Sequence, residues 1–137
     1  MNAFRVVVRA LAVLALLTGA VDVLIGLPGQ QKIGAALAEG YTDPLLNSQL
    51  RYLGAVWFGF GVLLWHCLGD LPKYASIVRG AFIIVFIGGL GRVASVFQFG
   101  FPLSELGRNF VILATAIEIV GMPLLLVWMR SLLPRTA

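Results

Sequence analysis

Charged residues are scarce in this chain of 137 residues, in which Asp, Glu, Lys and Arg together make up 12% of the sequence. Soluble domains carry about 25%, whereas 60% of this chain is hydrophobic. The scarcity excludes a soluble globular domain and indicates an integral membrane protein, so the lipid bilayer is the first expected partner. We attribute the net charge of +4 to basic residues at helix ends and expect no binding of nucleic acid.

Cysteine and histidine are almost absent, with Cys67 and His66 as the single residue of each type. One cysteine excludes an intrachain disulfide and provides no set of thiolates for a metal cluster. One histidine excludes a haem held by two histidines of the same chain. We therefore expect no metal site and no cofactor, and we interpret both residues as part of a membrane interface.

Long apolar runs predict four membrane-spanning helices, since one crossing takes about 20 residues. Proline and glycine interrupt the runs and mark their ends. The predicted spans cover residues 4–27, 49–68, 74–99 and 107–129. They leave no room for a soluble domain, so residues 1–137 are predicted to form one all-α domain, an antiparallel four-helix transmembrane bundle. The connection 28–48 fits either an amphipathic segment on the membrane surface or a plain loop.

Lysine and arginine are distributed unevenly between the two sides of such a bundle. Six of them fall on the side that holds both termini: Arg5, Arg9, Lys73, Arg79, Arg130 and Arg135. The other side has Lys32 and Arg108, with Arg51 at its border. Because basic residues are retained in the cytoplasm, we expect the N-terminus and the C-terminus to be cytoplasmic.

Four charged residues lie inside the predicted spans, and they are Asp22, Arg51, Arg92 and Glu118. A charge at the centre of a membrane helix costs about 2.5–3.5 kcal/mol on insertion scales, so these side chains are expected to face one another. At about 1.5 Å per residue, Asp22 and Arg92 each lie roughly 27 Å from the cytoplasmic start of their spans. Arg51 lies within one turn of an outer end, and Glu118 lies near the middle. The four charges are thus predicted to form a neutral cluster in the outer half.

Small residues accompany each of these charges. Gly19 lies near Asp22, Gly54 follows Arg51, Gly88 and Gly89 precede Arg92, and Ala114 and Gly121 flank Glu118. Small residues let membrane helices approach closely. Pro123 removes a backbone donor just beyond Glu118 and is expected to disturb the helix there.

A family resemblance is carried by five motifs: Arg51–Gly54, Gly59–Gly61, Gly88–Arg92 with Ser95, Gly100–Pro102, and Glu118 with Pro123. From about Leu11 to Leu126 the chain resembles an uncharacterised bacterial family of small four-helix inner-membrane proteins, which is catalogued as a domain of unknown function and is distantly similar to DoxX-like proteins. The resemblance implies a four-helix bundle in a bacterial inner membrane and supplies no substrate. The DoxX-like proteins would imply quinone or thiol redox chemistry, against which the single cysteine argues.

These observations lead to a predicted ligand site formed by Asp22, Arg51, Tyr52, Arg92, Ser95 and Glu118. We expect it to bind or transport a small amphiphile, a lipid or a quinone-like molecule, because arginine holds carboxylate and phosphate groups. One alternative is a membrane-embedded acid/base enzyme of isomerase type, with Asp22 or Glu118 as the catalytic group. Another is an accessory subunit of a larger membrane complex, in which the charges form structural salt bridges only. Beyond the bilayer and the small molecule, the expected partners are further copies of the chain in a homo-oligomer or the subunits of such a complex.

Overall fold

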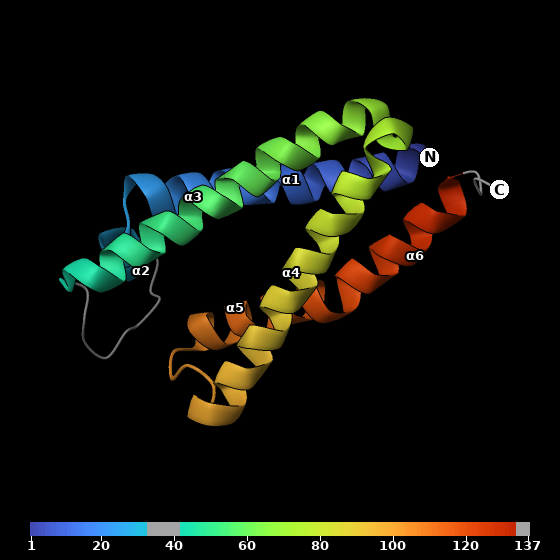
Figure 1. The fold of residues 1–137 in the computed structure, drawn as a ribbon. Coiled ribbons are helices and arrows are strands. Elements are labelled where there is room, and N and C mark those ends of the chain that lie inside the picture. Colours follow the sequence, from blue (N-terminus) through green and yellow to red (C-terminus); the bar gives the residue numbers. More distant parts are fainter. Residues whose placement is uncertain (33–41, 134–137) are drawn as a thin grey trace.

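The structure is a computed structural model, and it describes residues 1–32 and 42–133. This part of the chain is helical and contains no strand, which confirms the predicted all-α class. The helices, shown in Figure 1, are α1 (Asn2–Leu24), α2 (Leu27–Lys32), α3 (Pro44–Cys67), α4 (Leu71–Phe99), α5 (Glu105–Ala116) and α6 (Met122–Leu132). A 3₁₀ turn, Leu68–Asp70, joins α3 to α4, and a π-helical turn, Ile117–Gly121, joins α5 to α6.

Three continuous helical stretches among the described residues are long and apolar enough to cross a membrane: Asn2–Leu24, Pro44–Phe99 and Glu105–Leu132. The middle stretch folds back on itself at the 3₁₀ turn, so it contains two long helices, α3 and α4 (Figure 1). The shortest of the four resulting helices is α1, which is about 35 Å long, against roughly 30 Å for the hydrocarbon core of a bilayer. The prediction of four helices able to span a membrane is therefore confirmed.

The helix ends are set by local capping groups. The side chains of Asp43, Asp70 and Ser104 accept hydrogen bonds from backbone N–H groups in the first turns of α3, α4 and α5. Such caps satisfy donors that have no partner inside the helix. Two glycines with positive φ angles follow helices, Gly26 after α1 at 65° and Gly100 after α4 at 76°. Glycine adopts this left-handed conformation without steric cost, so both positions stop a helix.

The helix bounds differ from the predicted spans where these caps were overlooked. The first helix ends at Leu24, before the expected break at Pro28, because the turn at Gly26 comes first. The second long helix begins at Pro44 and not at residue 49, since Asp43 caps it. Of the connection 28–48, residues 33–41 lie outside the described residues. The choice between a surface segment and a loop therefore stays a prediction there.

Glycines bring α1 and α3 into backbone contact. A Cβ atom placed on Gly19 would lie 2.6 Å from the backbone nitrogen of Phe58, and one on Gly61 would lie 2.8 Å from the carbonyl oxygen of Ala12. A Cβ on Gly54 would lie 2.5 Å from that of Asp22. A larger residue would collide with backbone at two of these positions, so the glycines allow α1 and α3 to pack closely together.

The buried core occupies one end of the molecule. It combines the first half of α1 with the end of α3, the first half of α4 and most of α6, and its largest fully buried side chains are Phe4, Leu64, Leu68, Leu71, Phe82, Met122 and Met129. The rings of Phe4 and Trp128 meet edge to face at 5.5 Å, which ties α1 to α6. Apolar packing therefore holds all the long helices together near the two termini.

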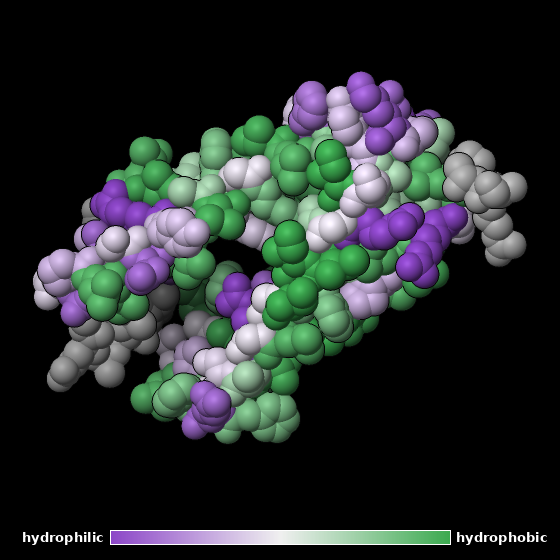
Figure 2. Space-filling view, in the orientation of Figure 1, coloured by the Kyte–Doolittle hydropathy of each residue, from purple (hydrophilic) through white to green (hydrophobic). Residues whose placement is uncertain are grey.

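At the other end the helices separate into two layers. Figure 1 shows the pair α1 and α3 diverging from α4 and α5 toward the side that carries α2. Helix α5 contains no buried residue, and it comes close to α4 and the π-turn but to neither α1 nor α3. The space-filling view in Figure 2 shows a hollow between the layers, with hydrophilic groups at its edge. The fold is thus closed at one end and open at the end where the charged residues were predicted.

The glycine contacts lead to a first prediction. Replacing Gly19 by Ala should destabilise the protein by about 1–3 kcal/mol, the usual cost of overpacking. Gly59 lies on α3, and a Cβ atom placed there would have nothing within 4 Å, so Gly59→Ala should be neutral or slightly stabilising because alanine favours helix. Thermal unfolding of both variants in detergent measures the difference. Equal stability of the two variants would contradict the close packing of α1 on α3.

Candidate functional site

The site is built on an ion pair between α4 and the π-turn. The Nε atom of Arg92 lies 3.0 Å from Oε1 and 2.9 Å from Oε2 of Glu118. The Glu118 side chain is 12% exposed and that of Arg92 is 39% exposed. Glu118 is thus enclosed by protein, whereas Arg92 reaches the surface at the end of the molecule where the helices separate. Within the described ranges it is the one salt bridge.

Gly89 allows Glu118 to reach this position. A Cβ atom on Gly89 would lie 2.7 Å from Cβ of Glu118 and 3.0 Å from Cδ1 of Ile119. The π-turn therefore rests directly on the α4 backbone, and Glu118 extends along α4 to Arg92 one turn further on. Of the two adjacent glycines that were expected to assist packing, Gly89 does so, whereas Gly88 has open space around it.

The π-turn that carries Glu118 has a local cause. Residue 123 of a regular helix would donate its N–H to the carbonyl of Ile119, but Pro123 has no N–H and its ring would collide with that carbonyl. The structure widens the helix at Ile117–Gly121, which Met122 alone separates from the proline. Span four was predicted as one helix disturbed at Pro123, and the disturbance takes the form of this π-turn. Single π-turns occur frequently at functional sites.

Arg92 keeps most of its hydrogen-bonding capacity. Its contact with Glu118 uses Nε alone, and neither Nη group makes a hydrogen bond to any residue that the structure describes. The guanidinium carbon lies 5.5 Å from the ring centroid of Phe110 on α5, a cation–π distance that restrains its orientation. Four N–H groups of a planar, permanently charged side chain are therefore held in place and available.

Asp22 and Arg51 make different contacts. Asp22 Oδ1 accepts a hydrogen bond from Gln30 Nε2 at 2.6 Å, and Arg51 Nη1 donates to the carbonyl oxygen of Val23 at 2.5 Å. The backbone N–H of Leu27 donates to Asn47 Oδ1 at 3.1 Å. An arginine at the last carbonyls of a helix is a favourable cap. Together these bonds attach the end of α1 and the start of α2 to α3.

The six predicted site residues therefore fall into groups. Arg92 and Glu118 form one pair, Asp22 and Arg51 belong to the α1–α2 turn, and among the described residues no hydrogen bond or ion pair links the two sets. Tyr52 is 65% exposed, and Ser95 is also exposed. The structure gives neither of them a hydrogen bond to either set.

Sequence reasoning missed three residues that shape these contacts. Gln30 and Asn47 sit beside Asp22 and Arg51, but they come from a connection without a recognisable pattern. Phe110 lies against Arg92 and is one aromatic residue in an apolar span, so nothing marks it in the sequence. All three become visible only when separate segments are folded together.

A comparison with known families places the chain. The model of one family matches residues 3–129, nearly the whole chain. The chain belongs to the family described as a domain of unknown function, DUF4345. This confirms the expected membership of an uncharacterised family. No similarity to a curated protein or to a solved structure was found.

The ion pair yields a second prediction. Arg92→Gln and Glu118→Gln should each lower the free energy of unfolding, because each leaves an uncompensated charge among apolar groups. The double variant should lose less than the sum of the two, with a coupling of about 1–3 kcal/mol. Unfolding of all four proteins in detergent gives this value. Arg79→Gln, at an exposed arginine of the same helix, is the control, and strictly additive losses would contradict the pairing.

Proposed function

We propose that this DUF4345 protein binds a small amphiphile, a lipid or a quinone-like molecule, whose polar head lies against Arg92 inside the membrane. The observation that carries the proposal is the geometry of that arginine: Glu118 engages its Nε atom, and both Nη groups are left for another partner. A guanidinium presents these groups as a fork that matches a phosphate, a carboxylate or a carbonyl oxygen. Arg51, the other arginine inside a predicted span, already uses one of its Nη groups to bind the carbonyl oxygen of Val23.

Access to Arg92 supports the same function. The side chain is 39% exposed at the end where the helices separate, and the hollow in Figure 2 has hydrophilic groups at its edge. An amphiphile can bring its head to such a position while its tail remains in lipid. A hydrogen bond made there is stronger than one in water because the surroundings are apolar.

The remaining charges receive separate roles under this proposal. Glu118 neutralises Arg92 in the absence of ligand and fixes its direction. Asp22 and Arg51 hold the α1–α2 turn on α3, which makes them structural residues beside the site. Tyr52 and Ser95 are left as surface residues near its entrance.

Acid/base catalysis is the second candidate function. It is favoured by one observation, the placement of Glu118 on a π-turn, since such turns cluster at functional sites. Glu118 would then exchange a proton with a ligand whose head is bound by Arg92. If the protein is such an enzyme, Glu118 is required to convert the ligand but not to bind it. Simple binding involves no conversion of the ligand.

We also propose the arrangement in the membrane. The four long helices form an antiparallel bundle in a bacterial inner membrane, with both termini in the cytoplasm and the open end facing outward. Six Lys and Arg residues on the side of the termini, against two on the other side with Arg51 at its border, support this orientation.

The orientation leads to a third prediction, tested with reporter fusions. A fluorescent protein fused at the C-terminus should fluoresce, because it folds in the cytoplasm. Alkaline phosphatase inserted at Leu103, in the exposed turn between α4 and α5, should be active, because it requires the outer compartment. Active phosphatase at the C-terminus would show that the bundle is inverted.

The binding proposal leads to a fourth prediction. Protein purified from membranes should carry a small molecule that native mass spectrometry detects. Arg92→Lys keeps the charge that pairs with Glu118 but loses the fork, so the retained fraction should fall roughly tenfold, as expected for a charge-assisted hydrogen bond. Arg51→Gln is the matched control, which should lower stability and keep the molecule. Equal loss in both variants, or no bound molecule in the wild type, would contradict the proposal.

A further inference from the structure

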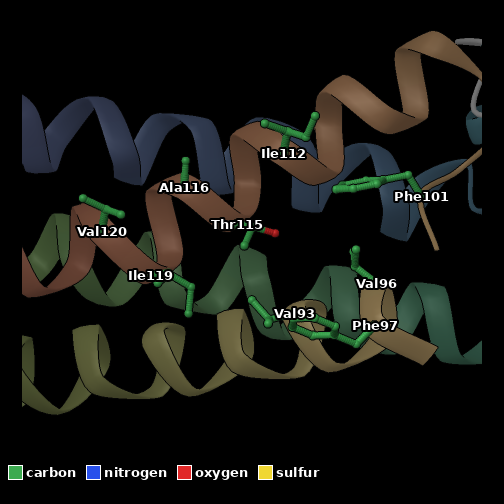
Figure 3. Close-up of a pocket in the computed structure, with 9 residues that line it drawn as sticks. All are labelled: Val93, Val96, Phe97, Phe101, Ile112, Thr115, Ala116, Ile119 and Val120. Atoms are coloured by element: carbon green, nitrogen blue, oxygen red, sulfur yellow. The ribbon is translucent and has the colours of Figure 1, made fainter. Parts of the chain in front are cut away.

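A groove of about 500 Å³ lies between α1 and α3, at the packed end of the molecule. It is lined by Val13 and Leu16 of α1 and by Val62, Trp65 and His66 of α3. Three of these side chains, Val13, Val62 and Trp65, are exposed, so the groove is open to the lipid phase. Figure 3 shows a second groove, between α4 and the α5–π segment, whose lining contains no ionisable residue. The α1–α3 groove differs from it because His66 lines one end.

Arg9 lies at the same end of this groove. It precedes Val13 by four residues and therefore lies on the same face of α1. The glycine contacts show that residue numbers rise along α1 as they fall along α3, with Gly61 against Ala12. His66, five residues beyond Gly61, is therefore near the level of Arg9. Arg9 is exposed and forms no ion pair with any residue that the structure describes, so its charge is available at the end of the groove.

Lys73 adds a second positive charge beside His66. The Lys73 Nζ atom lies 5.1 Å from the centroid of the Tyr74 ring, and the His66 ring lies 5.3 Å from the same centroid. Asp70 is the one acidic residue at this end of the described chain, and its Oδ1 atom accepts the backbone N–H of Lys73 at 3.3 Å as the cap of α4. Figure 2 shows hydrophilic groups gathered over the turn between α3 and α4. Positive charge therefore prevails where the groove ends.

We propose that this groove binds one acyl chain of an anionic phospholipid, whose head group lies between Arg9 and Lys73. The charges select an anion, and the apolar lining toward the centre of the bundle suits a chain.

The directions of the side chains agree with this occupant. Side chains of a helix lean toward its N-terminus, so Arg9 extends out of the membrane to the level of the head groups, as long basic side chains do. Trp65 is 54% exposed, and tryptophan is enriched at that level. The site lies at the packed end, away from Arg92, so it does not depend on the proposed function.

The test compares two lipids that differ in head-group charge alone. The protein is placed in nanodiscs that contain equal amounts of phosphatidylglycerol and phosphatidylethanolamine with the same acyl chains, and the lipid retained after transfer to detergent is counted by native mass spectrometry. The wild type should retain phosphatidylglycerol in preference. Arg9→Gln and Lys73→Gln should each reduce that preference about fivefold, the effect of one basic residue near an anionic head group. Arg9→Lys keeps the charge and should keep the preference.

Two further variants test the place of the lipid. Arg130→Gln is the matched control, because it removes the same charge at the same end from an exposed position on α6, a helix that makes no contact with α3 among the described residues. It should leave the preference unchanged. Val62→Trp, which fills the groove from an exposed position, should lower retention of both lipids without changing the unfolding temperature.

Three results would overturn the proposal. The first is equal retention of the two lipids by the wild type. The second is an equal effect of Arg130→Gln and Arg9→Gln, which would reduce the preference to the overall charge of this surface. The third is a dimer in the mass spectra that carries no lipid and is lost in Val62→Trp, which would show that a second copy of the chain covers the groove.

Discussion

The pairing of Arg92 with Glu118 is the interaction on which the open half of this protein depends. A charge inside a bilayer must be neutralised or solvated, and each of these residues neutralises the other at 2.9–3.0 Å. The pair requires Gly89, because a side chain there would push the π-turn away from α4. It also requires the π-turn itself, which Pro123 imposes on the last span. Gly89 and Pro123 are far apart in the sequence, but both are needed for the contact between Arg92 and Glu118.

The two ends of the bundle have different physical characters. Near the termini, buried apolar side chains from all the long helices form a continuous core, so that end is fixed by packing. At the other end there are two layers. The packing of α1 on α3 holds one layer together, and the ion pair between α4 and the π-turn holds the other. Among the described residues, α5 makes no contact with α1 or α3, so the space between the layers stays open. Such an architecture combines a packed base with an open end, which is compatible with the proposed binding of an amphiphile.

Much of the fold follows from composition and spacing, and the site follows only in part. Apolar runs long enough to cross a membrane predict four helices. The charged residues within these runs indicate which half of the bundle contains the candidate site. The pairing could not be deduced, because four charges at similar depths can combine in several ways until helix rotation is known. Arg51 illustrates the difficulty, because it binds the backbone carbonyl oxygen of Val23. Every residue has such a carbonyl, so the sequence does not indicate which one an arginine will bind.

A side-chain-resolution structure of the protein in a native-lipid nanodisc is the most direct test of whether an amphiphile binds the free groups of Arg92. We expect an elongated molecule whose polar end lies within hydrogen-bond distance of the Arg92 Nη groups, with Glu118 still bound to Nε. The contrary result is an Arg92 whose Nη groups are satisfied by protein side chains or by a second copy of the chain, with no bound molecule beside them. That outcome would make the ion pair a structural link between helices and would remove the basis for a ligand site.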